Sequence, residues 1–210
     1  MPPRQPDPSL FVVLPVFNEQ AALRQVIEDW TVVLRDNSPG FTLYVINDGS
    51  SDASLTILLE LSAEIPELEI LNQANLGHGR SCLNAYFTAI GRDSEWILQI
   101  DSDGQCDPQY FAKFWSERRY ERPTYGQRRS RADGIHRQLL SYGLRLLIRV
   151  ATGIDVRDSN VPYRLMHKST LKRCLSCIPI DPPLPNVLLA VLHQYWFNIR
   201  WVTIHFRARQ

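Results

Sequence analysis

The sequence predicts an α/β fold with a Rossmann-like, mostly parallel sheet and helices on both faces. Four short apolar runs, each with the length and composition of a buried strand, alternate with helical stretches. This alternation is typical of a parallel sheet wound on both sides. Polar and acidic residues directly follow the runs, where such sheets bind ligands. A chain of 210 residues can bury one substantial core.

Three strand–helix units are expected before the fourth strand. The strands are expected at residues 11–16, 43–46 and 68–71. The helices are expected at residues 20–34, at residues 53–64 and, for the third, up to about residue 91. Polar segments separate each strand from its helix: Phe17-Asn18-Glu19, Asn47-Asp48-Gly49-Ser50-Ser51-Asp52 and Asn72-Gln73-Ala74-Asn75-Leu76-Gly77-His78-Gly79.

The fourth strand, expected at residues 96–100, ends in two carboxylates, Asp101 and Asp103. Strand alternation places both on one side and turns Ser102 away. Carboxylates this close repel each other unless a cation lies between them, and a hard divalent ion carried on a diphosphate is the natural occupant. Gln105 offers a neutral amide oxygen just beyond. The structural alternative is a turn rich in Asp, Ser and Gly, which is common after a strand.

Acidic or polar residues thus follow four separate strands. Glu19, Asp48, Gly77 and the Asp101/Asp103 pair are all expected at the carboxyl edge of the sheet. Their convergence from distant parts of the chain predicts a binding site at that edge.

On these segments the chain resembles the inverting, GT-A-type glycosyltransferases of family 2, and within them the polyprenol-phosphate (dolichol-phosphate mannose synthase-like) branch. The resemblance covers almost the whole chain. It rests on six segments in order: Leu14-Pro15-Val16-Phe17-Asn18-Glu19, Ile46-Asn47-Asp48-Gly49-Ser50-Ser51-Asp52, Asn75-Leu76-Gly77-His78-Gly79, Asp101-Ser102-Asp103-Gly104-Gln105, Asp158-Ser159-Asn160-Val161-Pro162-Tyr163-Arg164-Leu165 and Phe206-Arg207-Ala208-Arg209.

The resemblance implies metal-dependent, inverting transfer of a sugar from a GDP- or UDP-linked donor to an acceptor, expected to be a polyprenyl phosphate. Mg²⁺ or Mn²⁺ is expected on Asp101, Asp103 and Gln105. The expected catalytic residues are Asp101, Asp103 and Arg164. The expected nucleotide-sugar contacts are Pro15, Phe17, Glu19, Ile46, Asp48, Ser102, Arg128 and Arg209. A soluble sugar or protein acceptor and a non-catalytic nucleotide-binding module are the alternatives.

The chain departs from the family pattern at several positions. Phe17 replaces a frequent Tyr, Asn47 replaces the first Asp of the usual Asp-Asp-Gly-Ser, and His78 stands where Lys is common. Residues 182–188 (PPLPNVL) contain no Glu-Asp pair of the kind that supplies a general base to sugar hydroxyls. An acceptor that is already an anionic phosphate needs no strong base, so this absence favours the lipid-phosphate branch.

Two other nucleotide-dependent classes require glycines that the chain lacks. A nucleotidyltransferase needs a Gly-rich loop after its first strand, and a dinucleotide-dependent dehydrogenase needs a similar turn. Residues 15–20 contain no glycine. A non-catalytic module would tolerate loss of metal ligands, yet this chain keeps them.

Arginine is concentrated in residues 118–164, which hold 11 of the 20 arginines and only four acidic residues. Nucleic-acid binding is one explanation of such a run, but no nucleic-acid partner is expected here. Arg118, Arg119, Arg122 and Arg131 are expected in a solvated loop. A helix is expected at residues 135–151, with Arg137, Arg145 and Arg149 on one face. It either packs on the sheet or rests on anionic lipid.

The chain is expected to form one domain over residues 10–210, preceded by a flexible, proline-rich leader at residues 1–9. No segment reaches the ~20 apolar residues that cross a bilayer, and the leader is no secretory signal. A cytoplasmic location, at the inner face of the membrane, is expected. A helix at residues 188–195 and a last strand at residues 199–206 are expected. In the family this strand continues toward membrane helices, so truncation is expected. The four cysteines are too sparse for a disulfide framework. Cys174-x-x-Cys177 could be half a zinc site or a redox pair, but ordinary half-buried thiols are expected there.

Overall fold

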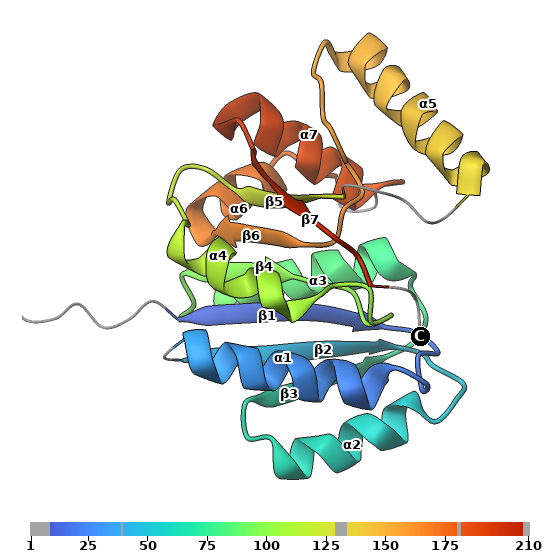
Figure 1. The fold of residues 1–210 in the computed structure, drawn as a ribbon, viewed down its shortest axis with the longest axis vertical. Coiled ribbons are helices and arrows are strands. Elements are labelled where there is room, and N and C mark those ends of the chain that lie inside the picture. Colours follow the sequence, from blue (N-terminus) through green and yellow to red (C-terminus); the bar gives the residue numbers. More distant parts are fainter. Residues whose placement is uncertain (1–8, 39, 129–133, 180–181, 208–210) are drawn as a thin grey trace, which may run out of the picture.

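The computed structural model describes residues 9–38, 40–128, 134–179 and 182–207 (Figure 1). Residues 1–8 of the expected leader, and Arg131 and Arg209, lie outside the described residues. Of helix α5 (Gly134–Thr152), the structure describes side chains from Tyr142 onward, so the side chain of Arg137 lies outside as well.

Seven strands form one sheet in the order β3-β2-β1-β4-β6-β5-β7. The strands are β1 (Leu10–Val16), β2 (Phe41–Asp48), β3 (Leu68–Gln73), β4 (Trp96–Gln99), β5 (Thr124–Arg128), β6 (Arg164–His167) and β7 (Arg200–Ile204). Strand β6 runs antiparallel to both neighbours, and the other four pairings are parallel. The predicted mostly parallel α/β sheet is confirmed.

The apolar runs become the central strands because they are buried on both faces. All residues of β1 and β4 are buried, and so are the last six of β2. Near-continuous apolar sequence is what a parallel strand covered by helices requires. The sheet therefore provides a rigid base for the polar segments at its carboxyl edge.

Helices cover both faces of the sheet (Figure 1). On one face α1 (Leu23–Asn37) packs against α2 (Ser54–Glu64) and α4 (Phe111–Ser116), which follows the short 3₁₀ helix Pro108–Tyr110. On the other face α3 (His78–Gly91), α6 (Lys168–Leu175) and α7 (Pro185–Phe197) pack together. This is the doubly wound arrangement expected from the alternation of strands and helices.

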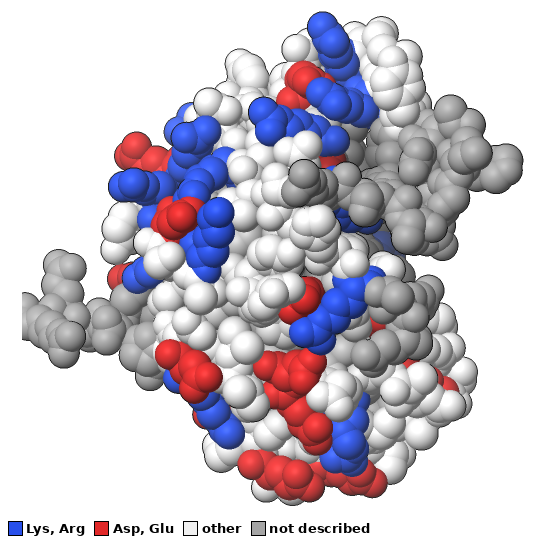
Figure 2. Space-filling view, in the orientation of Figure 1, with Lys and Arg blue, Asp and Glu red and all other residues white. Residues whose placement is uncertain are grey.

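Within the expected arginine-rich loop, several described residues lie in a strand or make specific contacts. Strand β5 lies within it, Arg118 stacks over the Trp115 ring at 4.0 Å, and Arg122 donates to the Asn198 carbonyl at 2.8 Å. Figure 2 shows Lys and Arg gathered over the upper half of this face, and Asp and Glu mainly over the lower half, where α1 and α2 lie. The near-neutral net charge of +1 therefore hides a marked asymmetry.

Helix α5 (Gly134–Thr152) lies apart from the sheet layers (Figure 1). Of its described side chains, Ile148 is buried and Leu144 is half-buried against the core, whereas the rest are exposed. The exposed set includes four large hydrophobic residues, Tyr142, Leu146, Leu147 and Val150. In the described part of the chain, no helix has the length and hydropathy needed to cross a membrane.

Cys82, Cys106 and Cys174 are buried and Cys177 is exposed, and all four are free thiols.

Candidate functional site

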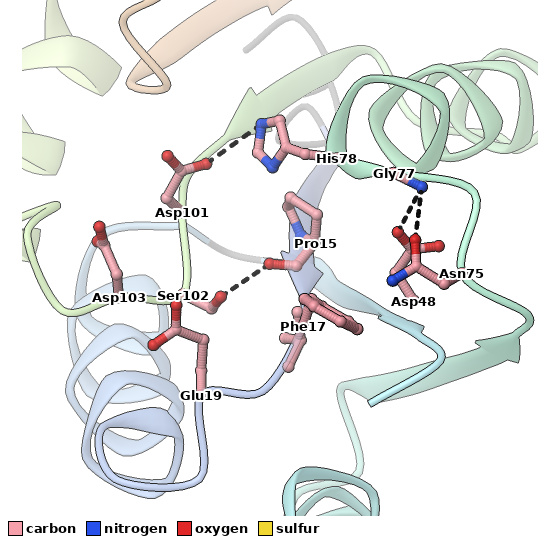
Figure 3. A pocket seen from close by; sticks show the side chains of 11 residues that line it. Pro15, Phe17, Glu19, Asp48, Asn75, Gly77, His78, Asp101, Ser102 and Asp103 are labelled. Atoms are coloured by element: carbon pink, nitrogen blue, oxygen red, sulfur yellow. Dashed lines mark hydrogen bonds and ion pairs between the residues drawn. The ribbon is translucent and has the colours of Figure 1, made fainter. Parts of the chain in front are cut away.

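A cavity of about 370 Å³ opens at the carboxyl edge of the sheet. Its walls come from the segments after β1, β2, β3 and β4, which are distant in sequence (Figure 3). The lining residues are Pro15, Val16, Phe17, Glu19, Asp48, Asn75, Gly77, His78, Asp101, Ser102 and Asp103. The convergence predicted from four strand ends is therefore present in the fold.

The segment after β4 presents Asp101 and Asp103 to the cavity (Figure 3). Ser102 points away from them and donates from Oγ to the Pro15 carbonyl at 2.8 Å, which ties this segment to the end of β1. The turn closes at Gly104, whose φ of +77° lies in the region that glycine adopts most easily. Asp103 Oδ1 accepts from the Gln105 backbone N–H at 3.0 Å.

The two carboxylates lie in an environment that suits a cation. Burial raises the pKa of the Asp101 carboxyl, His78 acts against this, and the Asp103 carboxylate adds to the rise. Asp101 Oδ1 is a buried oxygen without a hydrogen-bond partner. Among the described residues, no group of three or more His, Cys, Asp or Glu side chains could hold a metal. The pair would therefore need oxygens from a bound diphosphate or water to complete a divalent cation's shell.

Gln105 differs from its predicted role as a metal ligand. It does not line the cavity, and its backbone carbonyl accepts from the Arg207 N–H at 3.1 Å. The contacts that Gln105 makes here come from its backbone, whose N–H donates to Asp103 Oδ1 and whose carbonyl accepts from Arg207.

Asp48, at the end of β2, anchors the segment that precedes α3. Its Oδ1 accepts from Gln73 Nε2 at 2.8 Å and from the Leu76 N–H at 2.9 Å, and its Oδ2 accepts from the Gly77 N–H at 2.8 Å. Burial raises the pKa of Asp48, but these hydrogen bonds outweigh it and lower the pKa below its usual value. Asp48 is thus an ionised carboxylate in the cavity wall.

The segment after β1 forms another part of the wall. Asn18 adopts a positive φ of 56°, and its side chain accepts from the Ser51 N–H at 2.8 Å. The Glu19 N–H donates to Ser54 Oγ at 3.0 Å. These bonds join the ends of β1 and β2 and leave the Phe17 ring 47% exposed at the cavity. An exposed aromatic face there can stack on a planar ligand group.

His78, the first residue of α3, lies 3.7 Å from Asp101 through Nε2 and Oδ1 (Figure 3). The same Nε2 lies 3.6 Å from Cys82 Sγ. The Cys82 sulfur raises the pKa of His78 most, burial opposes it and Asp101 adds to the rise, so the pKa reaches about 10. His78 thus places an imidazole beside Asp101 in the cavity wall, with a raised pKa that favours its protonated form.

Arg164 differs most from its expected place beside the phosphates. Its side chain is fully buried, and it donates to the carbonyls of Val161 at 2.6 Å, Asn186 at 2.9 Å and Ser159 at 2.9 Å. The guanidinium also lies over the Tyr125 ring at 4.8 Å. It holds backbone segments together and is not exposed to a ligand, so the expected direct role of Arg164 is corrected to a structural one.

Two other residues that were expected to contact the sugar donor also lie away from the cavity. Ile46 is fully buried in β2, two residues before Asp48, where helices cover the sheet. Arg128 makes a bidentate ion pair with Asp158, from Nε to Oδ2 at 2.7 Å and from Nη2 to Oδ1 at 2.9 Å, and does not line the cavity. The expected contact from Arg209 falls outside the described residues.

The expected donor and metal contacts omitted four residues that line the cavity: Val16, Asn75, Gly77 and His78. All four lie at or after the ends of β1 and β3, where the strand-end rule places ligand contacts. Asn75 Oδ1 accepts from the Gly77 N–H at 3.1 Å, so it also shapes the segment before α3.

Solved structures with this fold include glucosyl-3-phosphoglycerate synthase from Mycobacterium tuberculosis. The complex with phosphoglyceric acid aligns with a TM-score of 0.70 and 17% identity, over 97% of this chain and 72% of that one. The complex with Mn²⁺ and UDP-glucose gives a TM-score of 0.70 and 17% identity, over 97% and 71%. These similarities confirm the GT-A fold.

Curated relatives include undecaprenyl-phosphate 4-deoxy-4-formamido-L-arabinose transferases. The Photorhabdus laumondii enzyme is 28% identical over 170 residues, which is 79% of this chain and 51% of the enzyme. The Salmonella choleraesuis enzyme is 28% identical over 182 residues, or 84% and 55%. The chain spans about half the length of these relatives. The model of the family "Glycosyl transferase family 2" matches residues 11–175, and the chain belongs to this family.

Proposed function

We propose that this protein transfers a sugar, with inversion, from a nucleotide-diphosphate sugar to a polyprenyl phosphate. The observation that carries the proposal is the single cavity in which Phe17, Asp48 and the Asp101/Asp103 pair meet. The exposed Phe17 ring and the ionised Asp48 carboxylate match the nucleoside of such a donor, and the carboxylate pair matches its metal-bound diphosphate.

The nucleoside part of the donor is assigned to the wall formed by β1 and β2. Phe17 offers its exposed ring for stacking on the base, and Pro15 lies next to it in the cavity wall. Asp48 accepts a hydrogen bond from the base, and Glu19 lies on the ribose side. Because Asp48 already accepts three bonds, its position is fixed before the donor binds.

The diphosphate is assigned to the opposite wall, at Asp101 and Asp103. The raised pKa of Asp101, and its Oδ1 that accepts no hydrogen bond, fit a divalent cation, Mg²⁺ or Mn²⁺. Bound there, the ion would neutralise the charge that grows on the leaving diphosphate. His78 lies on the same wall, 3.7 Å from Asp101, and in its protonated form would add to this neutralisation. Arg128 would have to leave Asp158 to reach a phosphate, so it is a weaker candidate.

The acceptor is assigned from chemistry and from the relatives. The relatives are named as undecaprenyl-phosphate sugar transferases. A phosphate oxygen is already anionic and attacks the anomeric carbon without a strong base, consistent with the lack of a Glu-Asp pair in residues 182–188. Such an acceptor brings the protein to the inner face of a membrane.

The proposal is tested by incubating the protein with UDP- and GDP-linked sugars, Mn²⁺ and undecaprenyl phosphate. Mass spectrometry of the lipid fraction should show a glycosylated lipid phosphate, together with release of the nucleoside diphosphate. The matched control omits the lipid. Equal nucleotide release with and without lipid, or transfer only to a soluble sugar, would overturn the assignment of the acceptor.

A further inference from the structure

A line of polar contacts leads from the cavity into the core through α3. His78 faces Asp101 at the cavity wall, and Cys82 lies one helical turn further along, with its sulfur 3.6 Å from His78 Nε2. The His78 side chain is 50% exposed, whereas Cys82 is fully buried. The buried Cys82 sulfur therefore lies against the same imidazole nitrogen that faces Asp101 at the cavity wall.

Cys82 is in turn surrounded by buried amides. Its sulfur lies 3.7 Å from Asn186 Nδ2 and 3.6 Å from Gln99 Nε2. The Tyr86 hydroxyl donates to Gln99 Oε1 and lies 3.5 Å from Asn186 Oδ1. Buried polar groups are costly unless they are paired, so this network has little freedom to rearrange.

The first turn of α7 is fixed against the first turn of α3. Arg164 donates to the Asn186 carbonyl at 2.9 Å. A Cβ added at Gly79 would lie 2.6 Å from Pro185 Cγ, so the two turns are in direct contact. The buried Arg164 thus fixes the first turn of α7. Asn186, in that turn, contacts Cys82, which in turn contacts His78.

We infer that Cys82 and Asn186 are positioning residues that hold His78 at the cavity wall beside Asp101. The kinetic consequence rests on the proposed function. The nucleoside is held at Phe17 and Asp48, so a displaced His78 should not weaken donor binding greatly. His78 adjoins the diphosphate, where charge develops during transfer, so its displacement should lower kcat.

Two substitutions at one position test the inference. Cys82→Ala removes the sulfur, and Cys82→Ser restores a small polar group. Cys177→Ala, at the exposed cysteine, is the matched control. The imidazole Cε1–H resonance of His78, assigned by its loss in His78→Gln, reports its surroundings in histidine-labelled protein. His205, which is exposed, serves as the reference resonance.

Cys82→Ala should shift or broaden the His78 resonance and leave that of His205 unchanged. It should lower kcat about tenfold and change the donor KM less than about twofold. Cys82→Ser should restore most of both properties, and Asn186→Ala, measured in parallel, should reproduce the Cys82→Ala effects more weakly.

An unmoved His78 resonance in Cys82→Ala would overturn the inference, as would an unchanged kcat or a serine variant no better than alanine. If Cys82→Ala fails to fold, as judged by circular dichroism, the same criteria apply to Asn186→Ala. If the wild-type protein turns over no donor, the proposed function fails, and the His78 resonance alone decides whether the residue is held in this way.

Discussion

Asp48→Ala tests the assignment of the base pocket. The substitution removes a carboxylate that accepts from Gln73 Nε2, the Leu76 N–H and the Gly77 N–H. Gln73 Nε2 keeps Ser81 Oγ, at 3.0 Å, and the half-buried Gly77 N–H keeps Asn75 Oδ1, at 3.1 Å, while Leu76 is exposed, so water can reach its amide. The net loss of unfolding free energy should therefore correspond to about one hydrogen bond to a charged group, roughly 1.5–3 kcal/mol.

Nucleotide binding should weaken by a similar free energy, because the bond from the base to Asp48 is lost. This corresponds to roughly a 10- to 150-fold rise in Kd. Isothermal titration with UDP and with GDP, each with and without Mn²⁺, measures it. Asp36→Ala, at an exposed position on α1, is the control. If Asp48→Ala weakened nucleotide binding only when Mn²⁺ is present, the reasoning would be refuted, and Asp48 would be assigned to the metal ion instead of the base.

Three further predictions follow from the same structure. Because folding lowers the pKa of Asp48, its ionised carboxylate stabilises the fold fully above the unfolded pKa of about 3.9, and this stabilisation is lost as the pH falls through the folded-state pKa. The difference in unfolding free energy between wild type and Asp48→Asn should therefore shrink below about pH 4. A difference that stays constant with pH would contradict this. Phe17→Ala should weaken UDP binding by about 1–3 kcal/mol, the value of stacking a base on an aromatic ring, while the melting temperature stays unchanged because the ring is exposed; unchanged affinity would exclude stacking. The protein should co-sediment with anionic liposomes at low salt and less so at high salt. The double variant Arg145→Gln with Arg149→Gln should bind the liposomes more weakly, by about 1 kcal/mol per arginine. Equal binding of variant and parent would contradict a membrane contact through α5.

The central strands and the cavity edge could be predicted from the sequence because their signals are local. A buried parallel strand must be apolar along its length, and the polar residue after it must lie at the sheet edge. Asp48, Asp101 and Asp103 satisfy this rule, and they line one cavity. Strands β5 and β6 gave no such signal, because they are short and carry Gln, Arg and His among their residues.

The surroundings of individual arginines could not be predicted, since they depend on distant backbone. The fully buried guanidinium of Arg164, in β6, is satisfied by carbonyls of Val161, Ser159 and Asn186, and the last of these belongs to α7. The pairing of Arg128 with Asp158 likewise joins residues 30 apart. From residue type and spacing alone, Arg128 and Arg164 both look like phosphate contacts. Only the folded structure shows that Asp158 and the backbone carbonyls already bind their guanidinium groups.

The most direct test of the central claim is a nucleotide titration of Asp103→Asn in the presence of Mn²⁺. The carboxylate lies at the cavity edge of a turn, so the variant should keep the fold, as its circular dichroism and melting temperature would show. Calorimetry should show that wild type binds UDP or GDP more tightly with Mn²⁺ than without, and that the variant loses this increase. If Asp103→Asn bound the nucleotide with Mn²⁺ as tightly as wild type, the assignment of the carboxylate pair to a metal-bound diphosphate would be contradicted.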